Sequence, residues 1–177
     1  MLNRFEPTWL VESIYDLSPE ELRNQGIKAV LTDLDNTLIA WNDPDGSPQL
    51  KAWLKDMKEA KIPVVVVSNN KHERIKRAVE PLALPFVSRA LKPLTRGIKQ
   101  AMKHYELAPN EVVLVGDQLL TDVFAANNAK IRSILVKPLV ASDAWNTKIN
   151  RFFESIVKKK LVKNGKINTK WGHTIND

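Results

Sequence analysis

The sequence has no cysteine in its 177 residues, which excludes disulfide bridges and any cysteine-based metal or redox site. It also lacks an apolar run near the roughly 20 residues that a bilayer-spanning helix needs. The opening residues do not have the basic stretch followed by an apolar stretch that is typical of a secretory signal. We therefore expect a cytoplasmic protein, and its 44% apolar content is sufficient for the core of one domain.

The positive charge of the chain is concentrated at one end. The net charge is +7, and residues 144–177 carry eight basic against two acidic side chains. Residues 1–143 carry 19 basic and 18 acidic side chains. We predict two parts, a nearly neutral body at 1–143 and a basic tail at 144–177. The tail either aids solubility as a solvated segment or contacts an anionic partner, a membrane surface or RNA.

Apolar segments alternate with helical patterns along the body. Segments that are apolar throughout are typical of strands buried on both faces of a parallel sheet. Strand–helix alternation with short connections predicts right-handed crossovers. The fold class is therefore α/β, a Rossmann-like three-layer α/β/α domain with a central parallel sheet of about five strands. Strands are expected at 27–34, 62–67, 86–91, 111–115 and 131–136, and helices at 18–26, 48–60, 71–82, 95–107 and 120–129.

Polar side chains follow three of these strands where each ends. Asp33 and Asp35 close the first strand, Ser68 and Asn69 the second, and Asp117 the fourth. Ligands of parallel α/β sheets bind at the carboxyl ends of the strands. Two carboxylates this close raise the free energy unless they share a cation or a proton. The pattern indicates an enzyme with a divalent metal, one carboxylate acting as nucleophile and the other as acid/base.

Four motifs in this order resemble those of the haloacid dehalogenase (HAD) superfamily. Residues 33–37, Asp-Leu-Asp-Asn-Thr, resemble its first motif, DxDxT. Ser68-Asn69 and Lys92-Pro93 resemble the second and third, and residues 116–122, Gly-Asp-Gln-Leu-Leu-Thr-Asp, the fourth, GDxxxxD. One such motif is weak evidence, whereas four in order on predicted strand ends are strong evidence. The resemblance implies the HAD fold and phosphatase chemistry.

The resemblance also implies a role for each aspartate. Asp33 would be the nucleophile that forms an aspartyl-phosphate, and Asp35 the general acid and base. Mg²⁺ would be held by the Asp33 side chain, the Asp35 backbone carbonyl and Asp117. Asp122 would support the metal or its water. Any one of these aspartates could instead be a helix N-cap.

The remaining motif residues are expected to hold the phosphoryl group. The Ser68 hydroxyl, Lys92 and nearby backbone N–H groups would stabilise its oxygens as charge spreads in the transition state. Asn36, Thr37 and Asn69 would complete the substrate-binding residues. Taken singly, Ser68 could be a plain helix start and Lys92 a surface lysine.

The gaps between the motifs are too short for a sizeable cap domain. Residues 40–61 hold one loop and one helix, and residues 70–91 one helix and a short strand. We therefore expect an open site that suits a large substrate or is closed by another subunit of an oligomer.

Nearly the whole chain resembles the small capless YqeG-type phosphatases of HAD class IIIA, including the opening residues 7–9, Pro-Thr-Trp. That family is related to mitochondrial phosphatidylglycerophosphate phosphatases. The resemblance thus implies a lipid phosphate as substrate. Alternatives are a soluble sugar or nucleotide phosphate, a phosphoprotein, or a basic RNA- or ribosome-associated module with a vestigial site.

The tail has a helical pattern of its own over 144–163. It places aromatic and aliphatic side chains on one face and lysines on the other, as in helices that lie on membrane surfaces. The alternative is that the apolar stripe packs on the sheet, as in most amphipathic helices. Residues 164–177 are polar, and we expect them to be loosely attached. The apolar face comprises Trp145, Ile149, Phe152, Phe153, Ile156, Val157 and Leu161.

Overall fold

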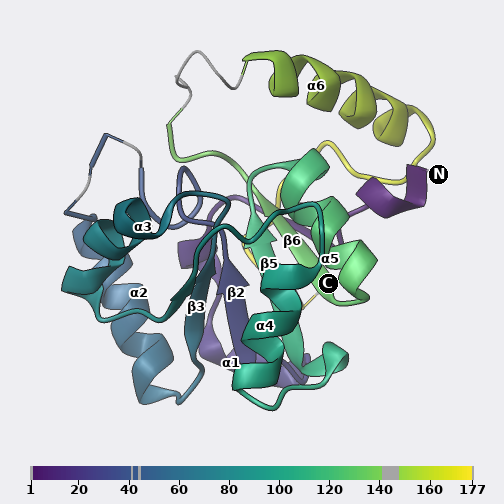
Figure 1. The fold of residues 1–177 in the computed structure, drawn as a ribbon. Helices are drawn as coiled ribbons and strands as arrows, with labels where there is room; N and C mark the ends of the chain where they lie inside the picture. The colour runs from purple at the N-terminus through teal and green to yellow at the C-terminus, as the bar shows by residue number, and fades with distance from the viewer. Residues whose placement is uncertain (1, 41, 44, 141–147, 177) are drawn as a thin grey trace.

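A computed structural model of the chain describes residues 2–40, 42–43, 45–140 and 148–176 (Figure 1). Six parallel strands form one sheet in the order β1-β6-β5-β2-β3-β4. The parallel α/β architecture predicted from the sequence is confirmed. The strands are β1 (Trp9–Val11), β2 (Ala29–Thr32), β3 (Val64–Val67), β4 (Phe86–Val87), β5 (Val112–Gly116) and β6 (Arg132–Val136).

Two details of the sheet differ from the prediction. The sixth strand, β1, is only three residues long, and it pairs with β6 through Trp9 and Ile134 at the edge. Such a short strand leaves no periodic pattern in a sequence. At the other edge, β4 ends at Val87, so residues 90–91 are not part of a strand.

The described residues form six α-helices. They are α1 (Pro19–Asn24), α2 (Pro48–Glu59), α3 (His72–Val79), α4 (Arg96–His104), α5 (Phe124–Ala129) and α6 (Lys148–Lys163). Short helical turns connect them: η1 (Leu2–Phe5), η2 (Ile14–Asp16), η3 (Glu80–Leu82), η4 (Pro109–Glu111) and the π-helical η5 (Leu119–Val123). The N-terminus of α1 is fixed by a reciprocal capping box between Ser18 and Glu21.

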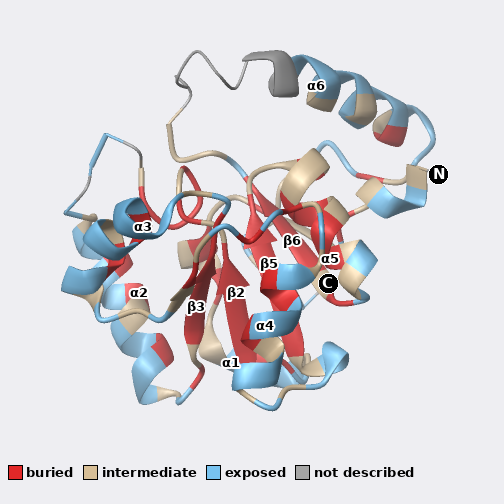
Figure 2. Ribbon diagram, viewed as in Figure 1, coloured by how far each residue is buried: buried red, intermediate tan, exposed pale blue. Residues whose placement is uncertain are grey.

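Alternate residues of the strands belong to two hydrophobic cores, one on each face of the sheet. Val113 and Val115 pack with residues of α1, α2 and α3, whereas Val112 and Leu114 pack with residues of α4 and α5. Successive side chains of a strand point to opposite faces, so strands that are apolar throughout produce three layers. The central strands β2, β3 and β5 are buried along their whole length between these layers, whereas β1, β4 and β6 are partly exposed (Figure 2).

The order of the strands creates a crevice between β2 and β5. The chain leaves β2 toward β3 on one side and later returns to form β5 on the other side. Ligands of open α/β sheets bind at the carboxyl ends of strands at such a switch point. In Figure 1, α6 lies above this end of the sheet.

The C-terminal segment packs on the body. Leu161 of α6 is fully buried in a cluster with Leu119 and Leu135. The expectation that residues 164–177 are loose is wrong, because Gly172 bridges to Val11 of β1 and Ile175 is fully buried. Two isoleucines and a glycine among polar residues were enough to attach the segment. The predicted helix start at 144, including Trp145, falls outside the described residues.

No helix in the described part of the chain has the length and apolarity needed to cross a membrane.

Candidate active site

A buried lysine joins two carboxylates at the end of β2. Lys92 Nζ lies 2.9 Å from Asp33 Oδ1 and 2.6 Å from Asp122 Oδ1, and its side chain is only 2% exposed. Asp33 directly follows β2, and its backbone N–H donates to the Val115 carbonyl of β5, 2.9 Å away. A buried charge is stable only when it is paired. Although burial alone would lower the pKa of Lys92, the two carboxylates raise it above its ordinary value.

Asn69 holds the backbone of Lys92 in place. The Lys92 backbone N–H donates to Asn69 Oδ1 at 2.7 Å, and Asn69 Nδ2 donates to the Lys92 carbonyl at 2.8 Å. Both polar atoms of the amide are therefore used within the protein. Asn69 therefore positions Lys92 through its backbone.

The fourth motif brings two further aspartates to Asp33. Asp117 directly follows β5, and its Oδ1 accepts a hydrogen bond from the buried Thr37 hydroxyl, 3.2 Å away. Asp122 lies on the π-helical turn η5 and accepts from the Gln118 backbone N–H at 3.2 Å. A Cβ atom at position 116 would lie 2.3 Å from the Asp122 carboxylate, so only glycine fits there.

These three aspartates form a group suited to a divalent cation. One carboxylate oxygen each from Asp33, Asp117 and Asp122 lies within 4.8 Å of the others. Three carboxylates and the Lys92 ammonium leave a formal charge of −2. Burial, with the charges of Asp122 and Asp33, raises the pKa of Asp117 to about 8. A hard dication with oxygen ligands would relieve this repulsion.

Asp35 has a different environment. Its carboxylate accepts hydrogen bonds from Asn70 Nδ2 at 2.6 Å and from Arg74 Nη2 at 2.7 Å. Its side chain is 32% exposed, and it is not among the three clustered carboxylates. The next residue, Asn36, has a left-handed backbone with a φ of 61°, so the chain turns directly after Asp35. The two aspartates of the first motif thus face different partners.

A cavity of about 590 Å³ joins these groups. Ser68 is buried at the end of β3, and its Oγ accepts from the Asn70 backbone N–H at 3.3 Å. Thr37 and Asp122 are buried outside the lining. Among the predicted site residues, the lining contains Asp33, Asp35, Asn36, Ser68, Asn69, Lys92 and Asp117.

Comparison with known proteins agrees with this geometry. Residues 90–156 match a family model described as HAD-hydrolase-like. The Bacillus subtilis protein named "Probable phosphatase YqeG" is 40% identical over 163 residues, covering 92% of this chain and 95% of that protein. The chain belongs to the YqeG-type phosphatases of the HAD superfamily.

Two solved structures share the fold of this HAD phosphatase. The cobalt-bound deoxy-D-mannose-octulosonate 8-phosphate phosphatase of Haemophilus influenzae is 18% identical, with a TM-score of 0.52, covering 84% of this chain and 96% of that one. An uncharacterised protein of Listeria monocytogenes serotype 4b gives the same identity and TM-score and covers 75% of this chain and 99% of that one. At this identity the likeness concerns the fold alone.

Several residues around the site of this HAD phosphatase lie outside its four motifs. Asn70 directly follows the second motif, and Arg74 lies four residues after Asn70. This short distance from the motif is the sequence signal that could have indicated both residues. No motif indicated the far wall of the cavity, which is formed by Lys137 after β6, by Glu154, Ser155 and Lys158 of α6, and by Trp171. Among the described residues no cap domain is inserted between the motifs, yet the C-terminal segment supplies a wall.

Proposed function

We propose that this HAD phosphatase is a Mg²⁺-dependent phosphomonoester hydrolase that works through a phosphorylated Asp33. One observation carries the proposal: the Asp33 carboxylate lines the cavity and is paired with the buried Lys92 ammonium, 2.9 Å away. A carboxylate fixed in this way is a nucleophile that needs no deprotonation before it attacks.

In the first step, an Asp33 carboxylate oxygen attacks phosphorus and the bond from phosphorus to the leaving oxygen breaks. Asp35, in its protonated form, donates a proton to that oxygen, so the leaving group departs as an alcohol. Asn70 and Arg74 orient the Asp35 carboxyl group from α3 and the residues before it.

In the second step, the Asp35 carboxylate takes a proton from water and the water oxygen attacks phosphorus. The bond between phosphorus and Asp33 breaks, which releases inorganic phosphate and restores both carboxyl groups. The Ser68 hydroxyl and the Lys92 ammonium hold the phosphoryl oxygens through both steps. Asn36 lines the same cavity, and Thr37 and Asn69 position Asp117 and Lys92 respectively.

The carboxylate group would hold the metal. The proposed ligands are Asp33, Asp117 and the Asp35 backbone carbonyl. Asp122 is paired with Lys92 and would support the metal or its water beside these ligands. When bound, Mg²⁺ would supply positive charge that screens the approach of the phosphate dianion to Asp33.

Hydrolysis of an aryl phosphate with and without Mg²⁺ tests the proposal. We expect Asp33→Asn to abolish turnover and to prevent the trapping of a phosphoenzyme by acid quench. Asp56→Asn, an exposed aspartate of α2, is the matched control and should leave turnover unchanged. Full activity of Asp33→Asn would exclude this mechanism.

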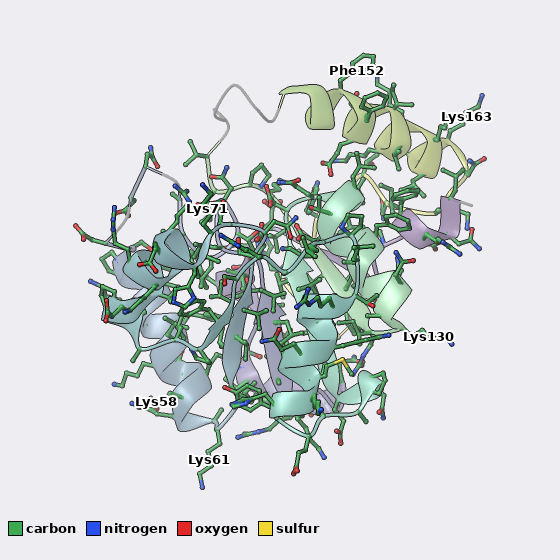
Figure 3. The ribbon with its side chains drawn as sticks, in the orientation of Figure 1. Lys58, Lys61, Lys71, Lys130, Phe152 and Lys163 are labelled. Carbon is green, nitrogen blue, oxygen red and sulfur yellow. The ribbon has the colours of Figure 1, made fainter. Side chains whose placement is uncertain are left out.

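We further propose that the substrate is a lipid phosphate presented by an anionic membrane, with phosphatidylglycerophosphate as the first candidate. On α6, Phe152 is 63% exposed and Phe153 is 53% exposed. The same helix lines the cavity through Lys158, so an apolar surface adjoins the entrance to the site. Figure 3 shows Phe152 projecting from α6 away from the body, with Lys163 farther along the helix.

Charge complementarity supports this surface. Lys159, Lys160 and Lys163 are exposed on α6 next to the phenylalanines. Apolar side chains beside lysines are typical of peripheral membrane helices. We therefore propose residues 1–143 as the catalytic unit and residues 144–177 as its substrate-side wall and membrane contact.

Sedimentation with vesicles tests the membrane contact. We expect binding to vesicles that contain anionic phosphatidylglycerol and not to neutral vesicles, and we expect loss of binding in Phe152→Ser/Phe153→Ser. Leu94→Ser is the control, because Leu94 is a similarly exposed apolar residue outside α6. Binding to RNA with no binding to vesicles would favour the nucleic-acid alternative, and turnover of soluble phosphates alone would favour a soluble substrate.

A further inference from the structure

Two lysines converge on one tryptophan in the wall opposite Asp33. Lys158 Nζ lies 4.9 Å from the centre of the Trp171 ring, and Lys137 Nζ lies 5.6 Å from it. All three residues line the same cavity as the Asp33 nucleophile. They come from α6, from the residue after β6 and from the C-terminal segment, so only the tertiary fold brings them together.

The C-terminal segment fixes the tryptophan at this position. The Gly172 backbone N–H donates to the Leu10 carbonyl at 3.0 Å, and the Gly172 carbonyl accepts from the Glu12 N–H at 2.8 Å. These bonds extend the edge of the sheet beside β1 and place Trp171 next to the end of β6. Glu12 also pairs with Lys137, with Nζ 2.7 Å from Oε1.

The two lysines of the wall differ in their pairing. Within the described part of the chain, Lys158 has no carboxylate at ion-pair distance, whereas Lys137 is paired with Glu12. The Glu154 carboxylate also lines the cavity, adds a negative charge to the wall and accepts the Leu120 backbone N–H at 3.0 Å. Both lysines are exposed to solvent, so an anion that enters the cavity can reach their ammonium groups.

We propose that Lys158, Trp171 and Lys137 form a subsite for a second anionic group of the substrate, carried by the leaving group. The inference rests on the proposed function and narrows its substrate class. Lys137 follows β6 and Asp33 follows β2, with β5 between them. Asp33 is level with Leu135 in the sheet register, and Lys137 lies two residues farther along. Two strand spacings of about 4.8 Å and a rise of about 3.3 Å per residue therefore separate their backbones by about 12 Å. A phosphate, phosphodiester or carboxylate a few bonds from the scissile phosphate spans this gap.

A pair of substrates with one carbon skeleton tests the subsite. Butane-1,4-diol bisphosphate carries a second anion, and butane-1,4-diol monophosphate does not. We expect kcat/KM to be about tenfold higher for the bisphosphate, the effect of one charge-assisted contact. Lys158→Met should remove this preference by raising the KM of the bisphosphate alone, and Lys158→Arg should largely restore it. Lys99→Met, the same change at an exposed lysine of α4, should keep the preference.

Several outcomes would overturn the subsite. One is an equal kcat/KM for the two compounds. Another is an equal effect of Lys158→Met on both compounds, as expected of a purely structural wall. A third is an effect of Lys99→Met as large as that of Lys158→Met. If neither compound is hydrolysed, the proposed reaction fails separately. The affinities of the two compounds, measured by calorimetry for the wild type and for Lys158→Met, then decide the subsite, and equal affinities reject it.

Discussion

At the residue scale, Lys92 connects the electrostatics of the site to its stability. Its ammonium is the only cation that contacts Asp33 and Asp122 within the described residues, and both pairs are buried or nearly so. Removing one partner of a buried ion pair leaves the others uncompensated, which costs more than the pair itself contributed. Lys92 therefore serves both folding and the developing charge on the phosphoryl group.

We predict that Lys92→Met lowers kcat by about 10²- to 10³-fold, the effect of losing one preorganised donor to the transition state. In metal-free protein it should also lower the free energy of unfolding by about 3 kcal/mol. Steady-state kinetics and urea unfolding measure the two effects. Lys99→Met, an exposed lysine of α4, should change neither. Wild-type turnover in Lys92→Met would contradict the assignment.

Gly116 shows how one missing side chain shapes the site. The space that its Cβ would occupy is filled by the Asp122 carboxyl group, 2.3 Å away. We predict that Gly116→Ala displaces Asp122, reduces turnover strongly and costs about 1–3 kcal/mol of stability through overpacking. Thermal unfolding and kinetics together test this. Gly172→Ala is the control, since its Cβ would meet ordinary contacts at 3.6 Å or more.

At the scale of elements, α6 has two different faces. Leu161 anchors it in the cluster beneath, whereas Phe152 and Phe153 project outward. Both interpretations of the amphipathic pattern therefore have support, because part of the apolar stripe packs on the body and part does not. The periodicity in the sequence could not divide the stripe, since packing depends on where the neighbouring elements end.

We predict that Leu161→Ala destabilises the protein by about 2–5 kcal/mol, because a fully buried leucine leaves a cavity. Phe152→Ala, at a side chain that is 63% exposed, should change stability by less than about 0.5 kcal/mol. Chemical unfolding of both variants makes the comparison. Equal effects would mean that α6 is not anchored as described.

At the scale of the whole molecule, the carboxylate group links stability to pH and metal. Burial and neighbouring charges raise the pKa of Asp117 to about 8, and burial raises that of Asp122 to about 6. A carboxyl group with a raised pKa in the folded state favours folding when it is protonated. That contribution is complete below the unfolded pKa and is lost as pH rises through the folded pKa.

Metal-free protein should therefore lose thermal stability between about pH 4 and pH 8. Mg²⁺ should restore it, with a larger rise in Tm at pH 8 than at pH 5, because protons compete with the metal. Thermal unfolding with and without Mg²⁺ at both pH values measures this. Asp117→Asn should reduce the dependence of Tm on pH and on Mg²⁺. If Mg²⁺ raises the Tm of the wild type equally at the two pH values, the linkage is contradicted.

Much of this architecture was predictable because its signals are local. Continuous apolar runs gave five of the six strands, and the four motifs gave the residues that the structure brings together around Asp33. Arg74 was harder to predict, since the composition of a helix does not show which of its side chains faces a site, and Asn70 lies in the bend before that helix without a motif role. β1 was too short to show a pattern at all.

The sequence by itself determined the α/β fold class, the order of the motifs and the concentration of positive charge in residues 144–177. These follow from residue types and spacings along the chain. Only the tertiary structure decided that Lys92 is buried between two carboxylates. It also decided that Leu161 anchors α6 on the body and that Trp171 contacts two lysines in the cavity of the nucleophile. Those contacts join residues far apart in the chain, and their geometry depends on strand order and packing, which no local pattern encodes.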